Sequence, residues 1–173
     1  MSSAETGAAD VEDWFRDLGL EPTERADREG VASWDLVLDG RRRFDLRVTV
    51  VLDPALGIIC WAHYAPPISD MFRKSYRTFL RWNDEFPFAK FSVGEDERPS
   101  LSVELPIELA TADQLGLALA RILGIADRLL EESAHWIWLG GRVPDAGGRT
   151  SANRALLDRY AARLPELTDT PEG

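Results

Sequence analysis

The sequence predicts an α+β fold, a two-layer sandwich in which helices cover one face of an antiparallel sheet of about five strands. Two observations predict it. Several segments alternate apolar and polar residues, which is typical of strands that bury only one face. Segments with helical periodicity stand before, between and after these strands and can cover the apolar face. The expected order is helix, three strands, helix, two strands and a long helix, followed by a tail helix.

One domain is expected from the length of 173 residues, which suffices for one sizeable core. We place this domain at residues 11–139. Residues 1–10 are small and polar and are expected to form a mobile leader. A glycine-rich loop over residues 140–150, an amphipathic tail helix over 151–164 and a frayed end over 165–173 should follow.

The first helix is predicted over residues 11–18, with Asp10 as a candidate N-cap. After a charged linker, two strands are expected at residues 31–38 and 44–52. Asp39-Gly40 stands between them and is a signal for a two-residue hairpin. These two strands should therefore pair antiparallel.

The third predicted strand, residues 56–65, is unusual because both of its faces carry apolar groups. One face holds Ile58, Cys60, Ala62 and Tyr64, and the other holds Ile59, Trp61 and His63. A sheet that is covered on one side needs only one apolar face. Either another part of the protein covers the outer face, or that face binds a partner.

A second helix is expected from Ser69 or Asp70 to about Glu85. Its inward face would consist of residues spaced by three and four, namely Phe72, Tyr76, Phe79, Asn83 and Phe86. Leaving a buried amide unpaired costs about 1 to 3 kcal/mol. We therefore expect Asn83, together with Pro87, to tie the end of the helix to a strand beginning at Phe88. This structural role is favoured over a catalytic one, because a lone amide without a nucleophile or metal is no active site.

The last two strands should form a hairpin around the turn GEDERP, residues 94–99. A long helix then begins at a capping box headed by Thr111. Leu117 and Ile125 fall off its main apolar stripe, which indicates either a second, partner-facing side or a wide buried face. The helix ends in HWIWLGG, which contains Trp136 and Trp138.

The charge balance excludes some classes of partner. Thirty Asp and Glu against twenty Lys and Arg give a net charge of −10, which repels phosphate backbones, so we expect no nucleic-acid partner. The run Arg41 to Arg43 with Arg47 is the local exception, and we interpret it as a solvated strand face rather than a phosphate grip. No apolar run approaches the ~18 to 20 residues that cross a bilayer, so no membrane partner is expected.

The content of cysteine and histidine bears on compartment and chemistry. A single Cys60 cannot form an internal disulfide, and the N-terminal residues lack the pattern of a signal peptide, so we expect a cytoplasmic protein. His63 and His135 are the only histidines, and neither stands at metal-ligand spacing from another His or from Cys. Cys60 and His63 should point to opposite faces of a strand and cannot form a nucleophile and base pair. We therefore expect no metal, no cofactor and no catalytic residues, and predict that the protein is not an enzyme.

The stretch FLRWNDEFPFAKFSVGEDERPSLSVELP, residues 79–106, resembles the YbjN-like family of bacterial sensory transduction regulators. The residues that carry the resemblance are Leu80, Trp82, Asn83, Pro87, Ala89, Lys90, Phe91 and the segment 101–106. In the order of elements it extends over about residues 10 to 138. The family is similar in fold to type III secretion chaperones, small acidic proteins that dimerise and bind extended segments of client proteins. The resemblance thus implies a non-enzymatic, chaperone-like adaptor or regulator and supplies no catalytic residue.

We accordingly expect a homodimer that binds a protein partner of unknown identity through apolar sheet or helix surface. The candidate partner-binding residues are Trp61, His63, Leu117, Ile125, Trp136 and Trp138. The alternative, from another class, is a small-molecule sensor or an unrecognised enzyme with a pocket between sheet and helices near His63, Tyr64 and Arg73. A pocket lined by convergent polar groups would favour this alternative, and a solid core would exclude it.

Overall fold

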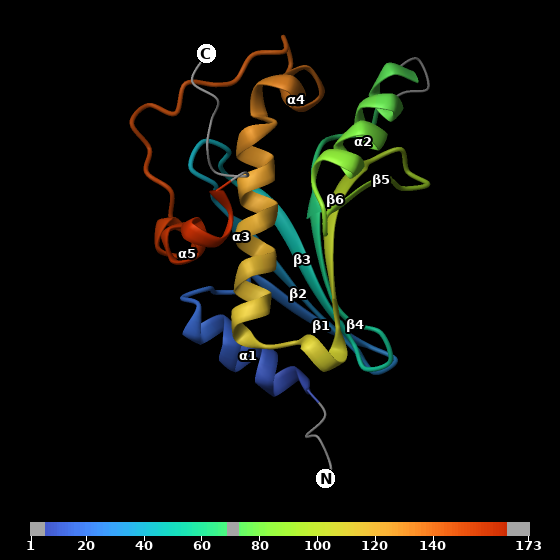
Figure 1. Ribbon diagram of the computed structural model, residues 1–173, viewed down its shortest axis with the longest axis vertical. Helices are drawn as coiled ribbons and strands as arrows, with labels where there is room; N and C mark the ends of the chain where they lie inside the picture. Colours follow the sequence, from blue (N-terminus) through green and yellow to red (C-terminus); the bar gives the residue numbers. More distant parts are fainter. Residues whose placement is uncertain (1–5, 69–72, 166–173) are drawn as a thin grey trace.

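The computed structural model describes residues 6–68 and 73–165 and has the α+β architecture that the sequence predicts. The described strands form one antiparallel sheet of six strands in the order β1-β2-β3-β4-β6-β5. The strands are β1 (Glu24–Arg28), β2 (Val31–Leu38), β3 (Leu46–Asp53), β4 (Gly57–His63), β5 (Lys90–Val93) and β6 (Pro99–Pro106). Helices cover one face of this sheet (Figure 1), so the two-layer sandwich is confirmed.

Five α-helices occur among the described residues, and three of them form one group. The helices are α1 (Ala8–Asp17), α2 (Arg73–Glu85), α3 (Ala112–Arg128), α4 (Leu130–Ile137) and α5 (Arg154–Tyr160). The long α3 runs along the sheet, and α1 and α5 pack against it (Figure 1). Helix α2 contacts β5, at the edge of the sheet far from β1. Two 3-10 turns, η1 (Ile107–Leu109) and η2 (Ala161–Arg163), precede α3 and follow α5.

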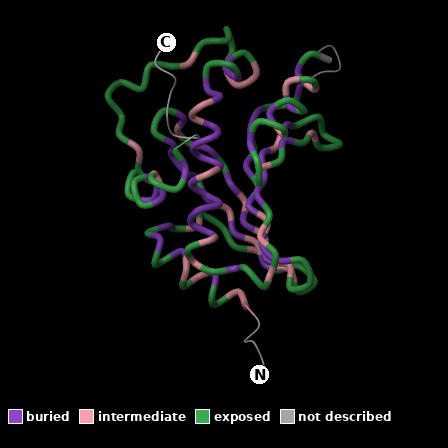
Figure 2. Tube along the Cα trace, viewed as in Figure 1, coloured by how far each residue is buried: buried purple, intermediate pink, exposed green. Residues whose placement is uncertain are grey.

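The hydrophobic core lies between the inner face of the sheet and the helices. On β3 the inward side chains of Leu46, Val48, Val50 and Leu52 are at most 3 % exposed. Burial of apolar area is the main favourable term in folding, so this alternation holds the two layers together. Figure 2 shows the buried residues along α3 and the strands, with exposed residues concentrated in the loops.

Two features near the N-terminus differ from the expectation. Helix α1 begins at Ala8 instead of residue 11, and Asp10 lies inside it, where its carboxylate accepts a hydrogen bond of 2.8 Å from the N–H of Gly7. The segment interpreted as a charged linker contains β1, a strand of sequence ERADR. This strand shows no apolar alternation because it lies at the edge of the sheet and is held by backbone pairing to β2.

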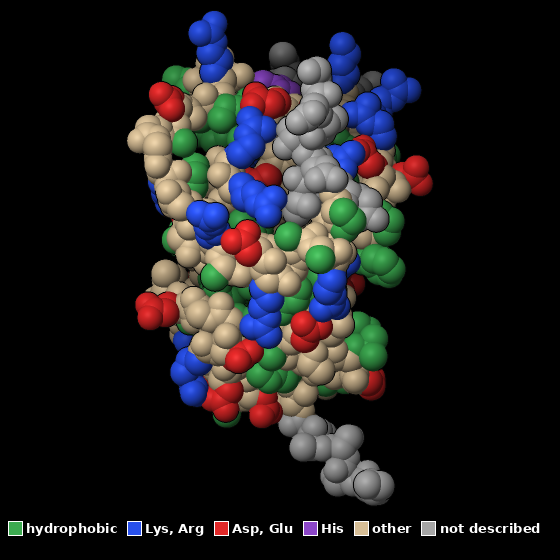
Figure 3. Space-filling model, turned by 60° about the vertical axis from the view of Figure 1, so that its left-hand side comes forward, with side chains coloured by type: hydrophobic (Ala, Val, Ile, Leu, Met, Phe, Trp, Pro, Cys, Tyr) green, Lys and Arg blue, Asp and Glu red, His purple; other side chains and the backbone are tan. Residues whose placement is uncertain are grey.

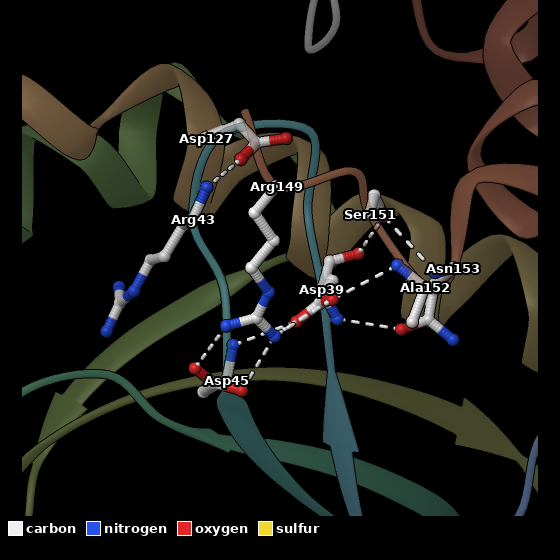
Figure 4. Close-up of polar contacts among 8 residues, drawn as sticks. All are labelled: Asp39, Arg43, Asp45, Asp127, Arg149, Ser151, Ala152 and Asn153. Atoms are coloured by element: carbon white, nitrogen blue, oxygen red, sulfur yellow. Dashed lines mark hydrogen bonds and ion pairs between the residues drawn. The ribbon is translucent and has the colours of Figure 1, made fainter. Parts of the chain in front are cut away.

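The connection between β2 and β3 is a seven-residue loop over residues 39–45, and the predicted two-residue hairpin is wrong. The reason is that Asp39 forms hydrogen bonds with groups outside the two strands and does not enter a tight turn between them. Its carboxylate, only 4 % exposed, accepts hydrogen bonds from the N–H of Asp45 and of Ala152 and from the Arg149 guanidinium, each at 3.0 Å. The N–H of Asp39 donates to Oδ1 of Asn153 at 2.7 Å. The loop therefore anchors the segment that leads into α5 (Figure 4).

The run of three arginines belongs to this loop and does not form a strand face, which corrects its interpretation. The backbone N–H groups of Arg41, Arg42 and Arg43 all donate to the Asp127 carboxylate, at 2.6, 2.9 and 2.8 Å. Asp127 stands in the last turn of α3. A carboxylate that accepts several backbone N–H bonds fixes a loop that has no partner in the sheet.

Asn83 and Pro87 stand where α2 leads into β5. The Asn83 carboxamide accepts from the N–H of Phe91 at 2.6 Å and donates to the carbonyl of Phe91 at 3.1 Å. The strand begins at Lys90, two residues after the expected start at Phe88. The expected start of α2, at Ser69 or Asp70, lies outside the described residues.

The C-terminal part forms three helices, α3, α4 and α5, where two longer ones were predicted. The long helix is interrupted at Leu129, which separates α3 from α4. Helix α5 covers only residues 154–160 of the predicted 151–164, and its N-cap is Asn153. Leu156, Leu157 and Tyr160 are at most 3 % exposed, so the tail docks on α3 as part of the core.

Candidate functional site

The outer face of the sheet, opposite the helices, is centred on Trp61. One row of paired residues crosses five strands of this face, in the order Asp35, Thr49, Trp61, Ser102, Lys90. Trp61 is 42 % exposed, whereas the neighbouring Cys60 and Ala62 are fully buried on the inner face. The strand thus has the two-sided character that its sequence predicts, and its outer apolar groups are left at the surface.

A hollow lies on the outer face beside Trp61. It has a volume of about 570 Å³ and is formed by β4, β6 and the hairpin between β5 and β6. Its lining includes Ile59, Trp61, Ser92, Ser100 and Arg98. The apolar indole and the hydroxyls together offer both contact area and hydrogen-bonding groups. This combination is suited to a protein segment, since binding sites join aromatic anchors to polar groups that fix orientation.

His63 lies next to Trp61 on the same face. The two rings stack with their centroids 5.1 Å apart and an angle of 24° between their planes. Burial lowers the pKa of His63 below its usual value, and the positive charge of Arg47 lowers it further. The imidazole is therefore favoured in its neutral form, in which it can stack on the indole and leave the outer face without an added positive charge.

The structure does not place Leu117 and Ile125 at an accessible surface. They are 8 % and 0 % exposed, in the same core as the main stripe of α3. Helices α1 and α5 pack against α3, so both apolar sides of α3 are covered by the chain itself. Of the two alternatives that the sequence left open, a wide buried face on α3 therefore accounts for the apolar character of these two residues.

Trp136 and Trp138 are both half-buried but have different surroundings. Trp136 packs against the core, with its ring centroid 5.0 Å from that of Phe79 and 5.5 Å from that of Trp82. Trp138 lines a second pocket, at the start of β3 and the end of β4. Of the six candidate residues, Trp61, His63 and Trp138 line these two hollows.

The second pocket has a volume of about 500 Å³ and is rich in basic side chains. Arg43, Arg47, Arg98 and His63 line it. His63 and Arg98 also line the hollow beside Trp61, so the two hollows share a wall. The side chain of Arg73, which the sequence analysis placed in such a pocket, lies outside the described residues.

Arg43 is the buried member of this set, with only 6 % of its surface exposed. Its Nη2 donates to the carbonyl of Tyr64, and its guanidinium carbon lies 4.6 Å from the centroid of the Tyr64 ring. Its Nη1 has no hydrogen-bond partner among the described residues. Burial lowers the pKa of Arg43, which reflects the cost of a charge removed from water. Figure 4 shows this side chain pointing away from the Asp127 carboxylate that holds its backbone.

His63 and Tyr64 of the pocket considered in the sequence analysis line this hollow, whereas its arginines were not predicted, because no short sequence pattern encodes the set. Arg43, Arg47 and Arg98 come from the β2–β3 loop, β3 and the β5–β6 turn, and the sheet brings them together. On the face drawn in Figure 3, by contrast, acidic and basic side chains are interspersed. Interspersed charges are usual on a solvated surface, whereas a surplus of positive charge within one pocket is unusual.

Within the described residues, no group of three or more His, Cys, Asp or Glu is arranged to hold a metal ion. In the same part of the chain, no helix is long and apolar enough to cross a membrane. Cys60 is fully buried and faces away from His63, and burial raises the pKa of its thiol to about 12. A thiol with this environment is a core side chain and not a nucleophile.

A comparison with protein families finds a match over most of the chain. The model of the family YbjN, described as "Putative bacterial sensory transduction regulator", matches residues 8–134. The chain belongs to the YbjN family. No curated protein matches the chain. The YbjN match includes β1 to β6 and α3 and ends within α4, so Trp138, Arg149 and α5 lie beyond it.

Membership of YbjN agrees with a regulatory or adaptor role, since the family is described as a regulator and not by a reaction. The central residues of both hollows fall inside the matched region: Arg43, Arg47, Trp61, His63 and Arg98.

Proposed function

We propose that this YbjN protein is a non-enzymatic, chaperone-like adaptor or regulator that binds an extended segment of a protein partner on the outer sheet face at Trp61. The observation that carries the proposal is the position of Trp61. Its indole is 42 % exposed, stacks on His63 and borders a hollow of about 570 Å³. A large aromatic side chain with that exposure is costly to leave in water and gains most when a partner covers it.

The partner we propose is a protein segment because the groups around Trp61 are those that bind a polypeptide. Ile59 gives apolar contact, and the hydroxyls of Ser92 and Ser100 can bond to a partner's backbone or side chains. Lys90 is engaged by Glu104 at 2.5 Å, and Arg98 by Asp96 at 3.2 Å. Both the lysine and the arginine of the hollow's lining are therefore paired, and charges engaged in this way compete less with apolar contact at the indole.

The test is affinity purification of the tagged protein from its native cells, with partner stoichiometry measured by mass spectrometry. A partner at stoichiometric amount should be retained by the wild type and lost in Trp61→Ala. Phe88→Ala is the matched control, because Phe88 is another exposed aromatic, 81 % accessible, and contacts Arg121 of α3 on the helical side. Loss of the partner in both variants, or in neither, would contradict a site at Trp61.

We propose further that the protein acts as a homodimer, as its resemblance to secretion chaperones implies. Light scattering coupled to size-exclusion chromatography measures the mass directly, against 19.4 kDa for one chain. A mass of one chain at micromolar concentration would overturn the dimer and leave the proposal for Trp61 standing.

The second candidate function is a small-molecule sensor, and the observation that favours it is the pocket of about 500 Å³ at His63, Tyr64 and Trp138. This volume falls in the range of ligand pockets, ~300 to 1,000 Å³. The ¹H–¹⁵N NMR spectrum of the protein, recorded with a panel of small aromatic acids, amides and alcohols, tests it. Shifts confined to the Trp138 indole and the backbone around it would support a ligand pocket, and an unchanged spectrum would exclude one.

A further inference from the structure

The pocket beside Trp138 has more positive than negative charge, although the whole chain carries −10. Its lining contains three arginines, namely Arg43, Arg47 and Arg98, against one carboxylate, that of Asp45. The Asp45 carboxylate is already bound by Arg149, at 2.7 Å. The surplus of positive charge is therefore local and is not cancelled inside the pocket.

The arginines of this pocket differ in how far they are neutralised. Arg98 pairs with Asp96 at 3.2 Å. Arg47 is exposed and forms no ion pair with any carboxylate of the described residues. Arg43 is buried, and the Asp127 carboxylate that binds its backbone N–H does not pair with its guanidinium in the described part of the chain. Arg43 and Arg47 are thus the two cations that a ligand could neutralise.

Arg43 gives the strongest indication of a ligand. A buried guanidinium costs free energy unless it is paired and fully hydrogen-bonded. Contact with the Tyr64 ring and carbonyl compensates part of this cost, but Nη1 stays without a hydrogen-bond partner among the described residues. Arginine presents a planar fork that matches the two oxygens of a carboxylate or phosphate. An oxyanion in the pocket that Arg43 lines would offset this buried positive charge.

The rest of the pocket is apolar. Phe44, Tyr64 and Trp138 supply aromatic surface, and Ala65, Pro66, Pro67 and Ile137 supply aliphatic surface. A few charged groups among apolar walls are typical of sites for small organic molecules. A bare inorganic ion would leave these walls uncovered.

We infer that this pocket binds a small organic anion, with its carboxylate or phosphate at Arg43 and Arg47 and its apolar body against Trp138. The inference rests on the small-molecule sensor function and names its ligand class. The ligand would also touch the wall shared by the two hollows, because His63 and Arg98 line both. Binding can thereby alter the stacking of His63 on Trp61, 5.1 Å away, and connect the pocket to the outer face.

Titration calorimetry and ¹H–¹⁵N NMR on the full chain test this inference with three probes of similar shape. Benzoate carries a carboxylate, phenyl phosphate carries a phosphate, and benzamide is neutral. At least one of the two anions should bind saturably and shift the Trp138 indole signal, and which anion binds more tightly decides between carboxylate and phosphate. Because Gln keeps a hydrogen-bond donor but loses the positive charge, Arg47→Gln should weaken binding of the anion about 10- to 100-fold.

Arg77→Gln is the matched control, because Arg77 is also an exposed arginine but lies on α2 away from the pocket lining. It should leave anion binding unchanged. Equal binding of benzamide and benzoate, or anion binding that Arg47→Gln leaves intact, would overturn the oxyanion site while leaving a small-molecule pocket. Failure of all three probes to bind would overturn both the anion inference and the sensor function.

Discussion

Asn83 holds Phe91 by both of its backbone groups. The carboxamide oxygen accepts from the Phe91 N–H at 2.6 Å, and the carboxamide nitrogen donates to the Phe91 carbonyl at 3.1 Å. The Phe91 side chain, on β5, in turn stacks on Phe79 of α2, the helix that carries Asn83. The ring centroids are 5.8 Å apart and the ring planes are at 6° to each other. One amide thus links the polar and the aromatic contacts between α2 and β5.

Asn83→Leu should lower the free energy of unfolding, by about 1 to 3 kcal/mol, because the Phe91 N–H and carbonyl lose their partners. Urea denaturation followed by circular dichroism measures this change. Partner binding per folded molecule should stay as in the wild type, since Asn83 lines neither hollow. Asp84→Leu, the same apolar substitution at the adjacent exposed position, is the control and should cost less. Lost binding at unchanged stability would show that Asn83 acts at the site itself.

Asp39→Ala should destabilise the protein and loosen its C-terminal segment. The buried carboxylate accepts from the N–H groups of Asp45 and Ala152, which would both lose their acceptor. The expected loss is about 1 to 3 kcal/mol, and trypsin should cleave the loop at Arg149 faster. Glu95→Ala removes an exposed carboxylate in the β5–β6 turn and should have little effect. Unchanged cleavage in Asp39→Ala would mean that α5 is held by its apolar contacts alone.

Cys60 should report on unfolding. Its side chain is fully buried and burial raises the pKa of its thiol to about 12, so iodoacetamide should label the native protein very slowly and the urea-unfolded protein rapidly. The folded thiol keeps its proton where the unfolded thiol loses it. The free energy of unfolding should therefore fall as the pH rises above about 9. Tyr64, whose pKa burial also raises to about 12, adds to this fall above about pH 10.

Cys60→Ala separates the two contributions. The substitution removes the fall in the free energy of unfolding that begins near the ordinary thiol pKa, and it leaves the fall that is due to Tyr64. Rapid labelling of the native protein at neutral pH would contradict the burial of Cys60.

The parts of the fold that local chemistry dictates could be predicted from the sequence. The alternation of Val48 and Val50 with polar residues gives β3, and Thr111 caps α3 as expected, accepting from the N–H of Gln114 at 3.1 Å. β1 could not be predicted in this way, because a strand held at a sheet edge by backbone pairing needs no apolar side chains. The loop after β2 was mispredicted because the partners of Asp39, Arg149 and Ala152, lie more than a hundred residues away.

The candidate site was predictable only in part, for a related reason. The two-sided β4 indicated Trp61 and His63 directly, since alternation assigns each residue to a face. Leu117 and Ile125 show the same apolar excess on a helix, but a pattern cannot say whether a partner or the chain's own α1 and α5 will cover it. The pocket at Arg43 depends on which strands are neighbours, and that is a property of the sheet rather than of any one segment.

Binding of an anion in this pocket should depend on pH through His63. Burial and Arg47 lower the pKa of His63, Arg98 lowers it further, and Asp35 and Asp96 raise it. A bound carboxylate favours the imidazolium and so raises the pKa of His63, which means that binding takes up a proton. The affinity for benzoate should therefore rise as the pH falls from about 8 to about 5.5, a range in which the carboxylate stays ionised because its pKa is near 4.

His63→Phe provides the control, because a Phe ring can still stack on Trp61 but cannot take up a proton. Calorimetric titrations of both proteins with benzoate at several pH values measure the effect. The wild type should show a pH-dependent affinity and the variant a nearly constant one. A pH dependence that persists in His63→Phe would assign the proton to another group, and a constant affinity in the wild type would place the anion out of reach of the wall that the pocket shares with the outer face.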